Sequence, residues 1–195
     1  MSLTTKLIAV NTILSTIGSA PVNSLDQTSA DASIAELILD EISREVQSRG
    51  WHFNTEFDVP LSLDGDGKIP VGSNVLRMDI NDEYTSVNPV VRGLFLYDVK
   101  NRTYVFTKAL KSTVIYLLDF TELPEAARRL ITVRTARIFQ DRYFSADNIH
   151  AYTREDEMRA LTMLEQAELE TGDYNMLDNN VAANRRRPHD GRRYT

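Results

Sequence analysis

The sequence predicts an α+β fold: a bundle of about four helices, an antiparallel β-sheet inserted into it, and an extended C-terminal arm. Apolar residues recur at helical spacing in two stretches, residues 1–50 and 121–172, which together form the predicted helical bundle domain. Residues 51–120 are rich in Val, Tyr, Phe and Thr and are interrupted by Gly, Pro and Asn-Asp clusters, which is typical of strands and turns. Residues 173–195 show neither period and form the predicted arm.

The first predicted helix carries an apolar stripe with alternating spacings of four and three residues. The members of the stripe are Leu3, Leu7, Val10, Leu14 and Ile17. Gly18 and Pro21 follow at once and predict the end of the helix. Because Ile8 and Ile13 lie off the stripe, we expect the helix to be covered on more than one side.

The second predicted helix ends at Gly50, a residue suited to the left-handed position after a helix. Thr28 and Asp31 stand in the relation of a capping box, with Asp in place of the usual Glu. The apolar stripe repeats every four residues, and polar residues occupy the predicted outer face. The stripe is Ile34, Ile38, Ile42 and Val46, and the outer face is Glu36, Asp40, Ser43 and Gln47.

The single tryptophan of the chain, Trp51, follows this helix directly and is itself followed by His52 and Phe53. These rings could line a ligand pocket or anchor the helix end in the core. In an extended segment, Trp51 and Phe53 would share one side and His52 would point the other way. No cysteine, second histidine or phosphate loop joins them from elsewhere. We therefore interpret Trp51 and Phe53 as core anchors that attach the β-rich insertion, residues 51–120, to the bundle.

The insertion is predicted to form one antiparallel sheet of four to six strands. Apolar residues alternate with polar ones between Phe53 and Leu61, which predicts a half-buried strand that includes Phe57. A hairpin is expected about Lys100-Asn101-Arg102. Residues 112–120 are more continuously apolar and predict a buried strand.

The third predicted helix, which begins near Pro124, is apolar on several sides and rich in arginine. Such a helix is expected to contact its own domain and a second subunit. Its apolar residues are Leu130, Val133, Ile138, Phe139, Tyr143 and Phe144, and its arginines include Arg128, Arg134, Arg137 and Arg142. The fourth predicted helix, residues 149–171, has a stripe of Met158, Leu161 and Leu164 and otherwise acidic faces. A neighbour's acidic fourth helix is a candidate partner for these arginines.

The charge of the chain is unevenly distributed. The net charge is −6, but the segment from Asn179 onward carries five Arg against one Asp, so the rest of the chain carries −10. This asymmetry predicts that the tail lies on an acidic surface, its own or a neighbour's, with nucleic acid as the rival partner. The arm also contains an apolar anchor. The candidate contact residues of the arm are Tyr174, Met176, Leu177, Arg185, Arg186, Arg187, Arg192 and Arg193.

Residues that carry catalysis or bind metals are few. The chain has no Cys, and its three histidines, His52, His150 and His189, lie in unrelated segments, which argues against a zinc site. The Asp64-Gly-Asp66-Gly loop fails the calcium-loop pattern, so a turn is expected there. No cofactor is predicted. A pair of carboxylates for glycoside hydrolysis stays open, because sequence cannot exclude it.

Four stretches, taken together and in order, resemble a known family. They are AVNTILSTIGSAPVNSL, QSRGWHFN, LPEAARRLITVRTARIFQDRYF and YNMLD. In this order and at these separations, the chain is similar to the tail tubular protein A family of short-tailed bacteriophages (podoviruses). The resemblance extends from about Leu3 to Asp178 and is weakest between Pro60 and Val114.

The resemblance implies a structural protein of the virion, made in the host cytoplasm, without an enzymatic activity. Family members form a ring, usually of twelve copies, between the portal protein and the tail nozzle, tail tubular protein B. The ring continues the DNA channel, helps to retain the genome and seats the tail fibres or tailspikes, with no membrane contact. Two other classes stay open: a carbohydrate-cleaving tail enzyme, and a nucleic-acid-binding module that uses residues 185–193.

Overall fold

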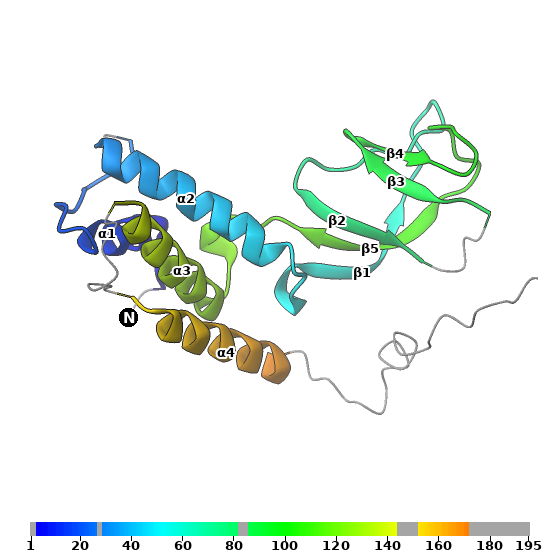
Figure 1. The fold of residues 1–195 in the computed structure, drawn as a ribbon. Helices are drawn as coiled ribbons and strands as arrows, with labels where there is room; N and C mark the ends of the chain where they lie inside the picture. The colour runs from blue at the N-terminus through cyan, green and yellow to red at the C-terminus, as the bar shows by residue number, and fades with distance from the viewer. Residues whose placement is uncertain (1–2, 27–28, 82–85, 144–151, 172–195) are drawn as a thin grey trace, which may run out of the picture.

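The computed structural model describes residues 3–26, 29–81, 86–143 and 152–171. Its described part contains four α-helices and five β-strands, in agreement with the predicted α+β class. The helices gather at one end of the molecule and the strands at the other (Figure 1). Helix α2 extends from the far end of the bundle to the edge of the β region (Figure 1).

Helix α1 spans Lys6–Ser15, and the side chain of Thr5 caps its N-terminus by accepting a hydrogen bond from the Ile8 N–H. Its buried side is broader than the predicted stripe, because Ala9 and Ile13 are buried together with Val10 and Leu14. Ile13 therefore lies in the core, although the spacing placed it off the stripe. Leu3, by contrast, precedes the helix and is exposed.

Helix α2 spans Ala30–Gln47 and is capped by Ser29, whose hydroxyl accepts a hydrogen bond from the Ala32 N–H. The predicted cap residue, Thr28, lies outside the described residues. Ile38, Ile42 and Val46 are buried as expected, whereas Ile34 is exposed. Ser43 and Gln47 were predicted on the outer face, and that prediction is wrong, since both are buried. They face the chain segment that returns from the β region, because the Gln47 amide bonds to the backbone of Leu118 there.

Helix α3 spans Glu125–Tyr143 and packs against α1, α2 and α4, so it is covered on nearly all sides by its own chain. Helix α4 spans Arg154–Thr171, and its predicted start at Ile149 lies outside the described residues. Ala160 and Leu164 form the buried side of α4. Met158, predicted to lie in the apolar stripe, is 64% exposed, because α3 covers the adjacent side of α4 instead.

The β region contains two sheets, which corrects the prediction of a single sheet. Strands β1 (Thr55–Leu61), β5 (Leu110–Tyr116) and β2 (Val75–Ile80) pair antiparallel in the order β1-β5-β2. Strands β3 (Pro89–Arg92) and β4 (Phe95–Asp98) form a separate two-stranded ribbon. Both edges of β5 are already paired, so the ribbon packs against the sheet through side chains. Leu96 enters a small buried cluster with Leu61, Ile69, Val71, Phe106 and Leu110.

Turns account for the other differences in this region. The ribbon turns at Gly93-Leu94, where Gly93 has φ +62°, and not at the predicted Lys100-Asn101-Arg102. The latter segment does reverse the chain, but it closes on the single bridge between Asp98 and Thr103. Phe57 is 57% exposed because a bulge interrupts β1 between Glu56 and Val59, which breaks the predicted alternation.

Candidate interaction surfaces

The junction between the bundle and the β region is built around Trp51. This side chain is 8% exposed and belongs to the same cluster of buried residues as the four helices. Its indole N–H donates a hydrogen bond to the Val46 carbonyl, at 2.7 Å. The Phe53 ring is stacked with the indole at a centroid distance of 6.5 Å and is half-buried against the bundle core. Trp51 directly precedes a 3₁₀ turn, η1 (His52–Asn54), and Phe53 lies within that turn, in place of the extended segment that we expected.

Two amides, neither of them singled out by the sequence, complete the junction. The Asn54 side-chain amide donates hydrogen bonds to the Gln47 carbonyl at 3.0 Å and to the Tyr116 carbonyl at 2.8 Å. Gln47 both accepts from the Leu118 N–H and donates to the Leu118 carbonyl. The end of α2 is thus bonded to both the first and the last segments of the β region, which fixes their relative position.

Gly50 permits this close approach. It has φ +77°, the left-handed conformation expected at the end of the helix. A Cβ atom at this position would lie 2.4 Å from the Ile115 side chain of β5. Any other residue would therefore require the Ile115 side chain to shift and would adopt a strained backbone.

The predicted interface residue Arg128 is inside the fold. It is 4% exposed, and its guanidinium donates hydrogen bonds to the carbonyls of Leu123, Thr4 and Thr121. Thr4 also donates from its N–H and its hydroxyl to the Glu125 carboxylate. Arg128 thus holds the N-terminal segment to the start of α3.

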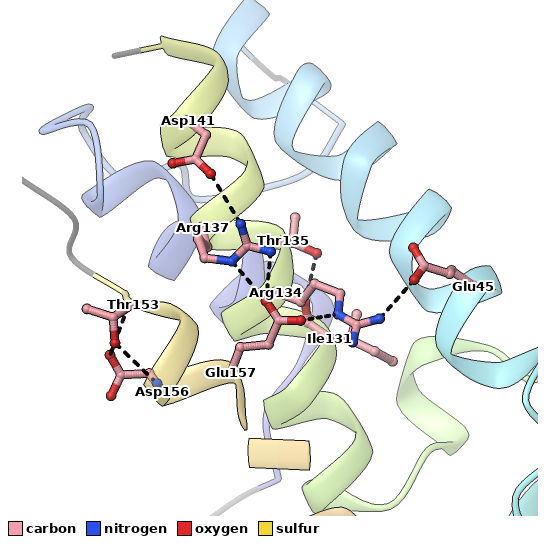
Figure 2. A network of polar contacts seen from close by, with 9 residues as sticks. All are labelled: Glu45, Ile131, Arg134, Thr135, Arg137, Asp141, Thr153, Asp156 and Glu157. Atoms are coloured by element: carbon pink, nitrogen blue, oxygen red, sulfur yellow. Dashed lines mark hydrogen bonds and ion pairs between the residues drawn. The ribbon is translucent and has the colours of Figure 1, made fainter. Parts of the chain in front are cut away.

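Arg134 and Arg137 were expected to pair with the acidic fourth helix of a neighbour, but they pair with α4 of their own chain (Figure 2). Glu157 accepts from Arg134 Nε at 2.7 Å and from Arg137 Nε at 2.8 Å. Arg134 also reaches Glu45 on α2 at 2.9 Å, and Arg137 reaches Asp141 at 3.2 Å. The spacing of the arginines predicts that this face of α3 pairs with carboxylates, but it does not show whether the same chain supplies them.

Of the remaining interface candidates, the structure describes Arg142 alone. Arg142 is exposed in the last turn of α3, and its role at an interface stays a prediction. The arm candidates lie outside the described residues: Tyr174, Met176, Leu177, Arg185, Arg186, Arg187, Arg192 and Arg193.

Two exposed faces of the described chain carry apolar side chains at a regular spacing. We define the ribbon face as Val90, Arg92, Phe95 and Tyr97, which cross-strand pairing places on one side of β3 and β4. The Arg92 guanidinium lies 3.9 Å from the Tyr97 ring centroid, and Tyr104 contacts the same ring edge-on at 4.8 Å. Aromatic residues and arginine are the types enriched in protein interfaces.

The second face lies on α2. We define the α2 ridge as Ile34, Leu37 and Glu41, spaced three and four residues apart on the side turned away from the core. Leu37 is 70% exposed. Helix α2 carries five acidic residues and one Arg, so the ridge is apolar with acidic surroundings, whereas the ribbon face is aromatic and carries a cation.

The described residues offer little for chemistry. No group of three His, Asp or Glu among them could hold a metal ion. Asp64 accepts hydrogen bonds from the N–H groups of Asp66 and Lys68, which is the expected turn. No described helix has the length and apolar character needed to cross a membrane. A carbohydrate-cleaving or nucleic-acid-binding function gains no specific support from this part of the chain.

Comparison with known proteins agrees with the resemblance found in the sequence. Residues 7–174 match the family described as Tube, tail tubular protein. Tail tubular protein A of Klebsiella phage KP34 is 27% identical over 154 residues, a match that covers 78% of this chain and 81% of that protein. Since the family match extends over all four helices and both sheets, the chain belongs to the tail tubular protein family.

Proposed function

We propose that this structural phage-tail protein is a ring-forming adaptor, a dodecamer in the virion, that joins the portal protein to the tail nozzle. The ring continues the DNA channel, supports genome retention and ejection, and seats the tail fibres or tailspikes. DNA passes through without sequence-specific binding. Family membership supports the tail location, and the subunit's two exposed faces support the ring.

The observation that carries the ring is the difference between these two faces. Subunits in a closed ring contact one another head to tail, so each needs two different, complementary surfaces. The α2 ridge lies toward the far end of the bundle, and β3 and β4 lie at the opposite end of the molecule (Figure 1). The junction at Trp51 and Gln47 fixes the two ends relative to each other. The aromatic, cationic ribbon face complements the apolar ridge on acidic α2.

The test removes one face at a time. Phe95→Glu alters the ribbon face and Leu37→Glu alters the ridge; both side chains are exposed, so both variants should fold. Particle mass is measured by light scattering, with and without portal protein. The wild-type chain should form rings, at least with portal, and each variant alone should not. Phe57→Glu, which changes an exposed ring outside both faces, is the matched control and should assemble like the wild-type chain.

A mixture of the two variants gives the sharper result. The Leu37→Glu chain keeps its ribbon face, and the Phe95→Glu chain keeps its ridge, so one contact between them is still possible. The mixture should give heterodimers that cannot extend into rings. Rings from either variant, or no complex in the mixture, would contradict this choice of faces. Persistent wild-type monomers with portal protein would contradict the adaptor function itself.

A further inference from the structure

A groove lies where the C-terminal part of α4 meets the turn after α2. Its volume is about 370 Å³. The residues that line it are Gly50, Trp51, His52, Glu165, Glu168 and Leu169. It is separate from the ribbon face and from the α2 ridge, and neither the arginine network nor the junction hydrogen bonds fill it.

The groove is apolar inside and acidic at its rim. Leu169 is 66% exposed and, like Trp51, contributes an apolar side chain to the lining of the groove. Glu165 is paired with Arg49 at 3.3 Å, and Glu168 accepts a hydrogen bond from the His52 N–H. These surroundings suit an apolar or aromatic segment that is followed by basic residues.

Such a segment begins directly beyond the groove. Helix α4 ends at Thr171, two residues after Leu169, and residues 172–195 follow. Tyr174 and Leu177 stand three and six residues after Thr171, so an extended chain brings them about 10 and 20 Å from the helix end. The sequence from Asn179 onward carries a charge of +4, opposite to the −4 of α4. This segment therefore fits the groove in three ways: it is attached close by, its apolar residues suit the apolar interior, and its basic charge suits the acidic rim.

We propose that this groove binds the segment Tyr174–Leu177 of the same chain, so that the arm folds back on the end of α4. A tyrosine can place its ring on the apolar lining and donate its hydroxyl to a rim carboxylate. Because the tether is only a few residues long, the segment is present at an effective concentration in the millimolar range. A neighbour's arm must come from solution and lacks this advantage.

Trp51 is the single tryptophan of the chain and lines the groove, so its fluorescence reports what occupies it. Three chains are compared in the absence of portal protein: the full chain, a chain ending at Asp178 and a chain ending at Thr171. The first two should share one emission maximum. The chain ending at Thr171 should emit at longer wavelength and be quenched more readily by acrylamide, and a peptide of residues 172–180 should reverse both changes.

Point variants guard against an effect of truncation on folding. Leu169→Glu in the full chain should give the red shift of the truncated chain, whereas Met163→Glu should not. Met163 is an equally exposed apolar residue of α4 that does not line the groove. Both chains should show the wild-type circular dichroism.

Several results would overturn the proposal. Equal emission from all three chains would show that no segment occupies the groove. A shift on truncation at Asp178 would assign the groove to the Arg-rich end. A full-chain signal that changes with protein concentration would assign it to a neighbour's arm. Because portal protein is absent, none of these results depends on the proposed ring.

Discussion

The bundle and the β region differ in how completely they bury their apolar side chains. Among the described residues, one cluster of twenty buried residues joins all four helices and includes Trp51. The corresponding cluster of the β region has six fully buried members. Around it, Val91, Leu94 and Val105 are exposed together with much of the ribbon face. The bundle therefore has the larger core, with Leu37 and Leu169 exposed on its outside, whereas the β region surrounds a small core with exposed apolar residues.

Charged and polar groups follow the same division. In the bundle, Arg128 and Glu157 are each bonded to several partners of the same chain. In the β region, the exposed Arg92 lies on the half-buried ring of Tyr97. A two-stranded ribbon is marginally stable by itself, so the ribbon depends on the sheet beneath it and on the junction to the bundle. The comparison indicates that the bundle core supplies most of the stability and that the ribbon supplies little, and four predictions test it.

The largest expected effect is that of Trp51→Ala. This change removes a buried indole from the bundle core and one hydrogen bond to Val46, and should lower the free energy of unfolding by about 3–5 kcal/mol. Urea unfolding followed by circular dichroism measures the loss. Phe57→Ala removes an exposed ring from β1 and should stay within about 0.5 kcal/mol of the wild-type value. Comparable losses in both variants would contradict the difference in packing between the bundle and the β region.

The second-largest effect is expected for Arg128→Lys, which tests whether a buried guanidinium stabilises the bundle. Lysine keeps the charge but cannot present a planar fork to the carbonyls of Leu123, Thr4 and Thr121. Unsatisfied buried groups should lower the free energy of unfolding by about 2–3 kcal/mol. Arg129→Lys, at the exposed neighbouring position, is the control. An unchanged midpoint for Arg128→Lys would refute the clamp between the N-terminal segment and α3.

Asp98 provides a pH-dependent test within the β region. Burial alone would raise the pKa of its carboxyl, but hydrogen bonds from Asn88, Asn101 and Lys100 outweigh burial and lower the pKa below its usual value. The stabilisation from a lowered pKa is present above the unfolded pKa, about 3.9, and is lost as the pH falls through the folded value.

Asp98→Asn should therefore cost about 1–2 kcal/mol at neutral pH, because an amide offers one acceptor oxygen to these donors. Below pH 4, the free energy of unfolding should fall less steeply in the variant than in the wild-type protein, because the variant lacks the carboxyl group that becomes protonated. Amide hydrogen exchange, read separately for β4 and α3, measures both effects, and they should be larger in β4. Asp66→Asn alters an exposed carboxylate and is the control. Equal exchange in β4 and α3 after Asp98→Asn would show that the two regions unfold as one unit.

The helices and their order could be predicted because a stripe buried against one partner leaves a clear period. Ile38, Ile42 and Val46 are of this kind. Ser43 and Gln47 were misplaced because polar side chains next to a stripe look exposed unless a distant backbone is known to meet them, and Leu118 is 71 residues from Gln47. The two sheets were read as one because alternation identifies strands but not which edges pair.

The contacts of the α3 arginines within the chain could not be predicted, for a related reason. The spacing of Arg134 and Arg137 shows two cations on one helical face, but their partner Glu157 is 23 and 20 residues further along the chain. Whether such a carboxylate comes from the same chain depends on the packing angle of α3 and α4. The ribbon face needed the register of β3 and β4, in which Val90 is opposite Tyr97 and Arg92 is opposite Phe95.

The smallest expected effect concerns that ionic network. Glu157→Gln keeps the size of the side chain but removes the charge that Arg134 and Arg137 share (Figure 2). Its carboxylate is 17% exposed, so the loss should exceed that of a surface pair, at about 1 kcal/mol. Glu155→Gln, two residues earlier at a side chain that is 85% exposed, should change stability by less than about 0.5 kcal/mol.

The dependence on salt shows whether the charges around Glu157 behave as partly buried or as exposed. Raising the ionic strength screens exposed charges far more than partly buried ones, so the gap between the Glu157 and Glu155 variants should persist in high salt. Unfolding midpoints at low and high salt measure the gap. If it closes, the arginines of α3 are held to α4 only weakly and remain available to another subunit, as the sequence first suggested. If it persists, α3 and α4 are held together by their own charges, which agrees with the proposal that neighbours contact the ribbon face and the α2 ridge.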